Sequence, residues 1–237
     1  MPIPPAPFIA CRVRDELPDE VAGLSATLQA GSKASQSALA GRLITDASCD
    51  LIDAFFNDMV LHMLETTGDD GFREAHEMLE DVKAKLRHAL GWLTGFFSNE
   101  RLAPVVRHYQ GLLVHLPTAH GDLAHLAFAI TPELARDSQA ALANLRDDER
   151  ADIKAGVEVL IRVVEAALVP LMYVPKERMR FNFIVDKTLN GFIAIANALL
   201  FRSLRKLAAG MPRELYPLVA DHLGQFLHQD APLPVGE

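Results

Sequence analysis

Residues 181–209, FNFIVDKTLNGFIAIANALLFRSLRKLAA, form the stretch of sequence that decides the fold. The 14 residues from Thr188 to Phe201 carry no charged side chain. This run is shorter than the roughly 20 apolar residues that a helix needs to cross a bilayer. Gly210 follows directly, and glycine is a typical helix end. The stretch therefore predicts a long apolar helix at the centre of a helical protein.

Apolar side chains elsewhere recur every three or four residues, which is the spacing of amphipathic helices. Six further helices are expected, over residues 37–66, 72–99, 102–116, 132–146, 147–169 and 212–229. Polar and apolar residues nowhere alternate over a stretch long enough to predict a sheet, and no internal repeat is visible. The predicted fold is all-α, a single-domain bundle of about seven helices with a central apolar helix near residues 181–209.

Both ends of the chain are rich in proline. Four of the first seven residues are proline, which lacks the backbone N–H that a helix interior requires. We expect residues 1–20 to be an extended arm, residues 21–230 to be the helical bundle domain and residues 231–237 to be a tail.

Pro170 leaves two possibilities open, because a proline inside a helical pattern either kinks the helix or ends it.

The composition excludes some classes of protein. The chain has 237 residues, half of them hydrophobic, and a formal net charge of −8, which disfavours non-specific binding to nucleic acid. Its first residues lack the basic start and the long apolar run of a signal peptide. Its two cysteines, Cys11 and Cys49, show no disulfide-type or metal-type spacing. We expect a cytoplasmic protein without a nucleic-acid partner.

The apolar stretch also carries a row of polar side chains. Asn182, Asp186, Asn190 and Asn197 lie within about 80° of one another on the expected helix, on the face that also holds aliphatic residues. A buried amide without a hydrogen-bond partner costs roughly 1–3 kcal/mol. The row is therefore either a structural polar network or the set of polar anchors of a ligand pocket.

A second charged row occurs in the helix expected over residues 147–169. Glu158, Arg162 and Glu165 share one face, at spacings that suit pairing between opposite charges. The rest of that helix is almost entirely apolar. The row indicates a narrow exposed edge held by ion pairs, and the alternative is an internal ion-pair network that lines a pocket.

Two groups of residues are candidates for a metal site. Asp46 and Asp50, four residues apart, could hold a magnesium ion that binds a diphosphate, but they lie opposite the apolar face and no second acidic motif accompanies them. Imidazole and carboxylate groups cluster near the middle of the chain, with a spacing that matches no known metal motif. These residues are His115, His120, Asp122 and His125. We therefore expect neither a metal nor a cofactor.

No glycine-rich phosphate loop, nucleophile-elbow serine or local Cys–His pair is present in the sequence. The leading hypothesis is a non-catalytic helical protein that binds a partner or an apolar small molecule and forms a homo-oligomer. One alternative is a metal-dependent helical-bundle enzyme that acts on an apolar or diphosphate-bearing small molecule. A second alternative, placed last, is a peripheral membrane protein that attaches through the apolar helix and its basic ends. Those ends contain Lys176, Arg178, Arg180, Arg202, Arg205 and Lys206.

Overall fold

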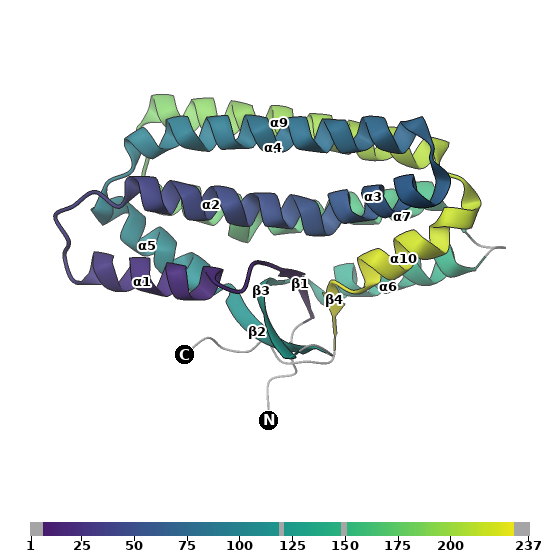
Figure 1. Ribbon diagram of the computed structural model, residues 1–237, viewed down its shortest axis with the longest axis horizontal. Coiled ribbons are helices and arrows are strands. Elements are labelled where there is room, and N and C mark those ends of the chain that lie inside the picture. The colour runs from purple at the N-terminus through teal and green to yellow at the C-terminus, as the bar shows by residue number, and fades with distance from the viewer. Residues whose placement is uncertain (1–6, 119–120, 148–150, 230–237) are drawn as a thin grey trace.

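The computed structural model of the chain is mainly helical and describes residues 7–118, 121–147 and 151–229 (Figure 1). Four sets of helical segments run into one another without a break, so the described residues form eight helical rods. In chain order the elements are β1 (Phe8–Arg12), α1 (Leu17–Gln29), α2 (Ser37–Ile52), the π-helix η1 (Asp53–Asn57), α3 (Asp58–Thr67), α4 (Asp70–Leu93), the 3₁₀-helix η2 (Thr94–Phe96), α5 (Asn99–Gln110), β2 (Leu113–Thr118), β3 (Gly121–Ala129), α6 (Pro132–Arg146), α7 (Ile153–Leu168), the π-helix η3 (Val169–Tyr173), α8 (Val174–Met179), α9 (Phe183–Gly210), the 3₁₀-helix η4 (Arg213–Leu215), α10 (Tyr216–Gly224) and β4 (Leu227–His228).

The predicted class, a predominantly α-helical bundle, is confirmed. Its rods are arranged in layers: α4 and α9 lie along one side, the rods α2–η1–α3 and α7–η3–α8 form the middle, and the remaining helices and the sheet lie on the opposite side (Figure 1). Side-chain caps fix several helix starts. Thr131 accepts a hydrogen bond from the backbone N–H of Leu134 at the start of α6, and Asp69 accepts one from Gly71 at the start of α4.

The expected N-terminal arm of residues 1–20 is wrong where the structure describes it. Strand β1 and the first turn of α1 occupy these residues, and no helix was predicted at α1. Residues 8–12 form β1, which lies between β3 and β4 in a four-stranded antiparallel sheet of order β2-β3-β1-β4. Phe8 and Ala10 are buried on one face of β1, and Ile9 and Cys11 are buried on the other. Because both faces are covered, the strand shows no alternation of polar and apolar residues, which is why the sequence pattern did not reveal it.

Two other boundaries differ from the expectation for the same reason. The helix expected over residues 102–116 ends at Gln110, and the following residues form the hairpin of β2 and β3. The helix expected to run to residue 229 ends at Gly224 and is followed by the short strand β4. These strands are too short, or too fully covered, to show a regular period of two.

The apolar helix is present as α9, but it lies at the outer side of the bundle instead of at its centre (Figure 1). Its inner face buries Val185, Ile193 and Leu204. Its outer face leaves Phe183 and Ile184 at 79% and 75% exposure. Among the described residues, α9 is the one helix whose length and composition would allow it to span a membrane, and only 12% of its most apolar window is buried. An apolar sequence predicts that a helix will be buried, but it does not show whether the rest of the same chain buries it.

Pro170 neither ends nor sharply breaks its helix. The chain continues from α7 through η3 into α8, and the backbone N–H of Val174 donates to the carbonyl of Val169, five residues earlier. The proline thus lies inside a π-helical turn, where the wider winding tolerates a residue that cannot donate its own N–H.

Gly41 lies at a close contact between α2 and η2. A Cβ atom at this position would overlap the Cγ2 methyl of Thr94. We expect Gly41→Ala to lower the free energy of unfolding by roughly 1–2 kcal/mol, because the overpacking cost exceeds the gain of about 1 kcal/mol in helix propensity. Urea denaturation monitored by circular dichroism measures this change.

Thr94→Ser provides the matched rescue. It removes the Cγ2 methyl and keeps the hydroxyl that donates to the carbonyl of Gly91 at 2.7 Å. The double variant should therefore be at least as stable as the native protein. A Gly41→Ala variant that unfolds at the native urea concentration would show that this contact does not limit the packing.

Candidate functional site

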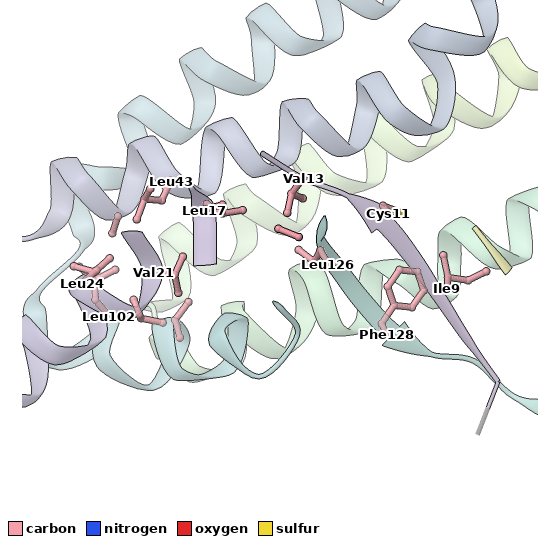
Figure 2. Close-up of a cluster of buried hydrophobic side chains, with 14 of the residues drawn as sticks. Ile9, Cys11, Val13, Leu17, Val21, Leu24, Leu43, Leu102, Leu126 and Phe128 are labelled. Atoms are coloured by element: carbon pink, nitrogen blue, oxygen red, sulfur yellow. The ribbon is translucent and has the colours of Figure 1, made fainter. Parts of the chain in front are cut away.

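A partly open apolar cavity of about 260 Å³ is lined by α1, α2, η1, α4, α5, α7, η3 and the inner face of the sheet. Part of its wall belongs to the large hydrophobic cluster drawn in Figure 2, where Leu17, Val21 and Leu24 of α1 approach Leu43 of α2. The sheet contributes Leu126 and its neighbours from β1 and β3. The wall therefore combines residues that lie far apart between Cys11 and Met172, which no single sequence window reveals.

The few polar groups in this wall are already engaged within the protein. The Ser48 hydroxyl donates to the carbonyl of Ile44 at 2.7 Å, and the Tyr109 hydroxyl donates to the carbonyl of Leu171 at 2.6 Å. Burial raises the pKa of the Cys11 thiol far above its usual range, so this side chain is a neutral thiol. The cavity thus presents hydrocarbon and no charged group to anything inside it.

Several aliphatic side chains that line the cavity are only half-buried. They include Leu51 and Ile52 of α2, Leu86 of α4, and Leu168 and Met172 of the α7–η3–α8 rod. A close-packed interior would cover such side chains completely. Their partial exposure indicates that the cavity communicates with the space between the middle layer and the layer of α4 and α9.

Both π-helical turns face this cavity. Phe55 and Phe56 enter it from η1, and Leu171 and Met172 enter it from η3. In η1 the backbone N–H of Asp58 donates to the carbonyl of Asp53. The carbonyl of Ala54, which would accept that N–H in an α-helix, is thereby left free. A π-helical turn thus changes the direction of the lining side chains and leaves a backbone acceptor that needs a donor from elsewhere.

Side chains of other helices supply those donors. The His222 Nε2 atom of α10 lies 2.9 Å from the carbonyl oxygen of Ala54, and the His108 Nε2 atom of α5 lies 2.7 Å from that of Pro170. A carbonyl only accepts, so each Nε2 carries the hydrogen. The carbonyl of Leu171 also lacks a helical donor, because the residue four positions later is Pro175, and Tyr109 bonds it instead.

A buried lysine fixes η1 against α4. The Lys83 ammonium, whose side chain is 6% exposed, lies 2.5 Å from Asp53 and 2.6 Å from Glu80. Burial alone would lower the pKa of Lys83, but the hydrogen bonds and charges of the two carboxylates outweigh burial and raise it. The Asn57 amide donates to Asp53 at 3.0 Å and accepts from His76 at 2.7 Å, which completes the network. The π-helical turn is thus held from both sides, by α10 and by α4.

The polar row of α9 does not line this cavity. Asn182 is exposed and caps α9 by accepting from the backbone N–H of Val185 at 3.0 Å. Asp186 and Asn190 bind the ammonium group of Lys176, at 3.1 and 2.6 Å. Asn197 is half-buried and makes no hydrogen bond with another described residue. The expectation that these groups lie among covering aliphatic side chains is wrong for Asn182 and Asn190, which face solvent because α9 lies at the edge of the bundle.

The charged row of α7 is exposed and pairs with other helices instead of with itself. Glu158 accepts two hydrogen bonds from Arg205 of α9, at 2.7 and 2.9 Å, and Arg162 pairs with Asp137 of α6 at 2.7 Å. Glu165 is exposed and contributes to the charge environment of Arg205. These groups tie α7 to its neighbours at the surface and do not enter the cavity.

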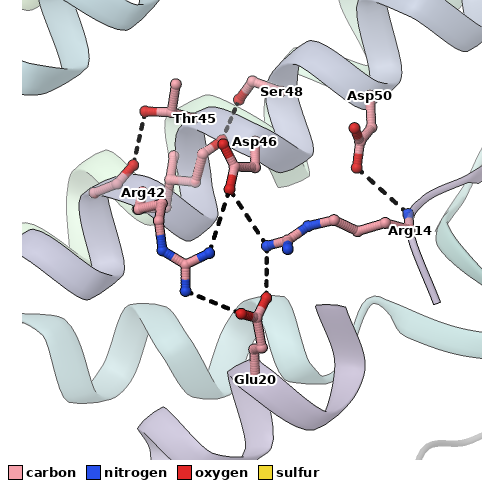
Figure 3. A network of polar contacts seen from close by, with 9 residues as sticks. Arg14, Glu20, Arg42, Thr45, Asp46, Ser48 and Asp50 are labelled. Carbon is pink, nitrogen blue, oxygen red and sulfur yellow. Dashed lines mark hydrogen bonds and ion pairs between the residues drawn. The ribbon is translucent and has the colours of Figure 1, made fainter. Parts of the chain in front are cut away.

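Cations of this chain occupy the acidic row of α2, as Figure 3 shows. Asp46 lies 3.4 Å from Arg14 and 3.5 Å from Arg42, and both arginines also bind Glu20, at 2.6 and 2.9 Å. Asp50 accepts from the backbone N–H of Arg14 at 3.4 Å. The two carboxylates thus bind Arg14 in the segment before α1, while Glu20 links α1 to both arginines, and Asp46 and Asp50 are not paired with each other to receive a magnesium ion.

The remaining metal candidates are dispersed. His115 is exposed on β2, and the His125 ring donates through Nδ1 to the carbonyl of Leu123 at 2.8 Å. Asp122 is exposed in β3, and His120 lies outside the described residues. Within residues 7–118, 121–147 and 151–229, no three histidine, cysteine or acidic side chains come together in a way that could hold a metal ion.

Sequence reasoning missed the residues that shape the cavity wall. One signal was present: Lys83 interrupts the apolar spacing of Leu79 and Leu86 on α4, where a solvent-facing lysine is not expected. His108 and His222 gave no such signal, because their partners are backbone carbonyls more than 60 residues away. The need for those partners arises only once the π-helical turns exist.

The two histidines that bond the π-helical turns predict a pH dependence. Burial is the main cause that lowers the pKa of both His108 and His222 below the ordinary value of about 6.5. The unfolded chain therefore binds more protons than the folded chain just below that pH, so this contribution to stability is present above about pH 6.5 and is lost as the pH falls. We expect the double variant His108→Gln/His222→Gln, which keeps an N–H donor at each position, to lose less stability than the native protein between about pH 7 and pH 5.

Urea denaturation at several pH values measures both slopes. His88→Gln is the matched control, because His88 is exposed and bonds no π-helical turn. It should retain the native slope. Equal slopes for the native protein and the double variant would contradict the assignment of these two histidines.

The apolar cavity with its two π-helical turns is the candidate site because its lining is almost wholly apolar, whereas a larger hollow of about 500 Å³ between α3, α4 and α9 has a more polar lining. Comparison of the chain with protein-family models, with curated proteins and with solved structures gives no match.

Proposed function

We propose that this protein binds an apolar small molecule, or the hydrocarbon part of a larger molecule, in the cavity between α2, α5 and α7. The observation that carries the proposal is a volume of about 260 Å³ that the chain's own side chains leave unfilled, within a wall that is almost wholly hydrocarbon. Ligand pockets are generally concave, largely apolar and few in number.

The energetic cost of such a space supports this proposal. Side chains that line unfilled space lose dispersion contacts with neighbouring atoms, and this loss lowers the stability of the folded protein. A ligand that fills the cavity would recover the lost dispersion contacts and would stabilise the folded state by mass action.

The size and polarity of the cavity narrow the class of ligand. One water molecule occupies about 30 Å³ of liquid, so 260 Å³ has room for roughly nine atoms of similar size. The engaged hydroxyls of Ser48 and Tyr109 offer no free anchor for a polar group. The favoured ligand is a neutral aliphatic or small aromatic group of about this size, and any charged part of the molecule would stay outside the cavity.

A cavity-filling substitution tests this proposal. Ala47 lies in the cavity wall on α2, and Ala47→Phe would place a ring in the space that the ligand requires. We expect the full-length variant to bind the small neutral fluorescent probe naphthalene, whose size is close to that of the cavity, at least about tenfold more weakly than the native protein, a loss of ~1.4 kcal/mol. Fluorescence titration measures the dissociation constants, and thermal melting shows whether the variant folds.

Ala141→Phe is the matched control. Ala141 is also half-buried, but it lines a separate, smaller cavity of about 70 Å³ between α6, α7 and α10. This control should keep the native affinity for the probe. Unchanged binding in a folded Ala47→Phe protein, or no probe binding by the native protein at all, would contradict the proposal.

A further inference from the structure

The outward surface of α9 carries an apolar stripe that no other part of the described chain covers. We call it the outer stripe, and its members share one line along the helix at spacings of three or four residues. They are Ile184, Thr188, Gly191, Ile195 and Leu199, all exposed, with the large side chains Ile184, Ile195 and Leu199 at 75%, 65% and 55% exposure. A helix that faces water normally places lysine and glutamate on such a line, so the outer stripe indicates a surface that is covered by a partner.

The charged side chains of α9 that flank the outer stripe are positive, whereas Asp69 and Glu74, at the start of α4, line the same surface hollow as Lys206 near the C-terminal end of α9. Lys187 lies beside its first part, and Arg202 and Lys206 continue its line toward the C-terminal end of α9. These three cations make no ion pair with any residue that the structure describes, whereas Arg205 is paired with Glu158. Asp186, the one acidic residue of α9, points to Lys176 on the inner side. The chain as a whole has a net charge of −8, so this apolar and basic surface is a local exception.

Exposed aromatic side chains extend the surface at the N-terminal end of α9. Phe97, directly after η2, stacks on Phe181 with ring centroids 6.5 Å apart, which places the end of α4 beside the start of α9. Trp92 at this end of α4 is 49% exposed, and Phe183 is 79% exposed. Tryptophan and phenylalanine at the rim of an apolar, basic surface are typical of contact with the membrane–water boundary.

A second copy of the chain is a poor partner for this surface. If two copies met antiparallel at Ile195, Lys187 of one copy would lie near Arg202 of the other, because these residues are eight and seven positions from the centre. A parallel arrangement would place each cation beside its equivalent. Both arrangements oppose like charges, which disfavours association.

From these observations we propose that α9 docks by its outer stripe on an anionic lipid surface, with its cations among the lipid head groups. The helix lies along the surface and does not cross it, because its inner face packs Val185, Ile193 and Leu204 against the protein. Basic residues near an anionic bilayer each contribute about a fivefold gain in affinity, and buried apolar side chains add to it. This proposal concerns a different surface from the interior cavity and does not depend on ligand binding there.

Vesicle co-sedimentation of the full chain tests the proposal. Vesicles of phosphatidylcholine with about one third phosphatidylglycerol should bind the native protein at low ionic strength, and vesicles of phosphatidylcholine alone should bind it at least roughly tenfold more weakly. Ile195→Glu should reduce binding to the anionic vesicles by roughly tenfold or more, since it places a carboxylate in the middle of the outer stripe. Arg202→Gln/Lys206→Gln should weaken binding and reduce its dependence on salt.

Ala26→Glu is the matched control, because Ala26 is exposed on α1 and the substitution adds the same charge far from α9 in the sequence. This control should bind anionic vesicles nearly as well as the native protein. Equal loss in both glutamate variants, or no binding of the native protein to anionic vesicles, would overturn the proposal.

Light scattering provides a second test. A native dimer that Ile195→Glu converts to a monomer would contradict membrane docking and would assign this surface to self-association. Probe binding in the cavity should be the same in Ile195→Glu and in the native protein, so the two proposals fail separately.

Discussion

The interior of this protein depends on two π-helical turns. In each turn a carbonyl without a backbone donor accepts a hydrogen bond from a side chain of another helix. The His222 ring donates a hydrogen bond to the carbonyl of Ala54 in η1, and the His108 ring donates one to the carbonyl of Pro170 in η3. Without these donors each turn would bury an unpaired acceptor, at a cost of roughly 1–3 kcal/mol. Because each turn also points aromatic or aliphatic side chains into the cavity, the same bonds that satisfy the backbone fix the shape of the cavity wall.

The charged clusters of the molecule act around this interior and not within it. Lys83 holds η1 against α4, and the group of Arg14, Glu20 and Asp46 holds α1 against α2. Each cluster joins two elements that also contribute hydrocarbon to the cavity wall. The polar clamps therefore lie outside the apolar cavity, while the apolar side chains of α9 that remain uncovered face outward.

The sequence predicted the helical class and the long apolar helix, because both follow from local periodicity and composition. It did not predict the location of α9 at the edge, since apolarity alone does not distinguish a core from a covered surface. The row from Asn182 to Asn190 was recognised as polar, but its role in capping α9 and binding Lys176 depends on the sharp connection between α8 and α9. No local sequence pattern predicts the cavity, because its wall combines residues that range from Cys11 to Met172.

The central claim is that the helices of the middle layer border an apolar space that this chain does not fill by itself. A crystal structure determined under xenon pressure tests it most directly, because xenon enters dry, apolar cavities. The account predicts xenon between Leu51 and Phe55 on one side and Val163 and Leu171 on the other. A structure in which Leu86 packs down into that space and no xenon binds would contradict it.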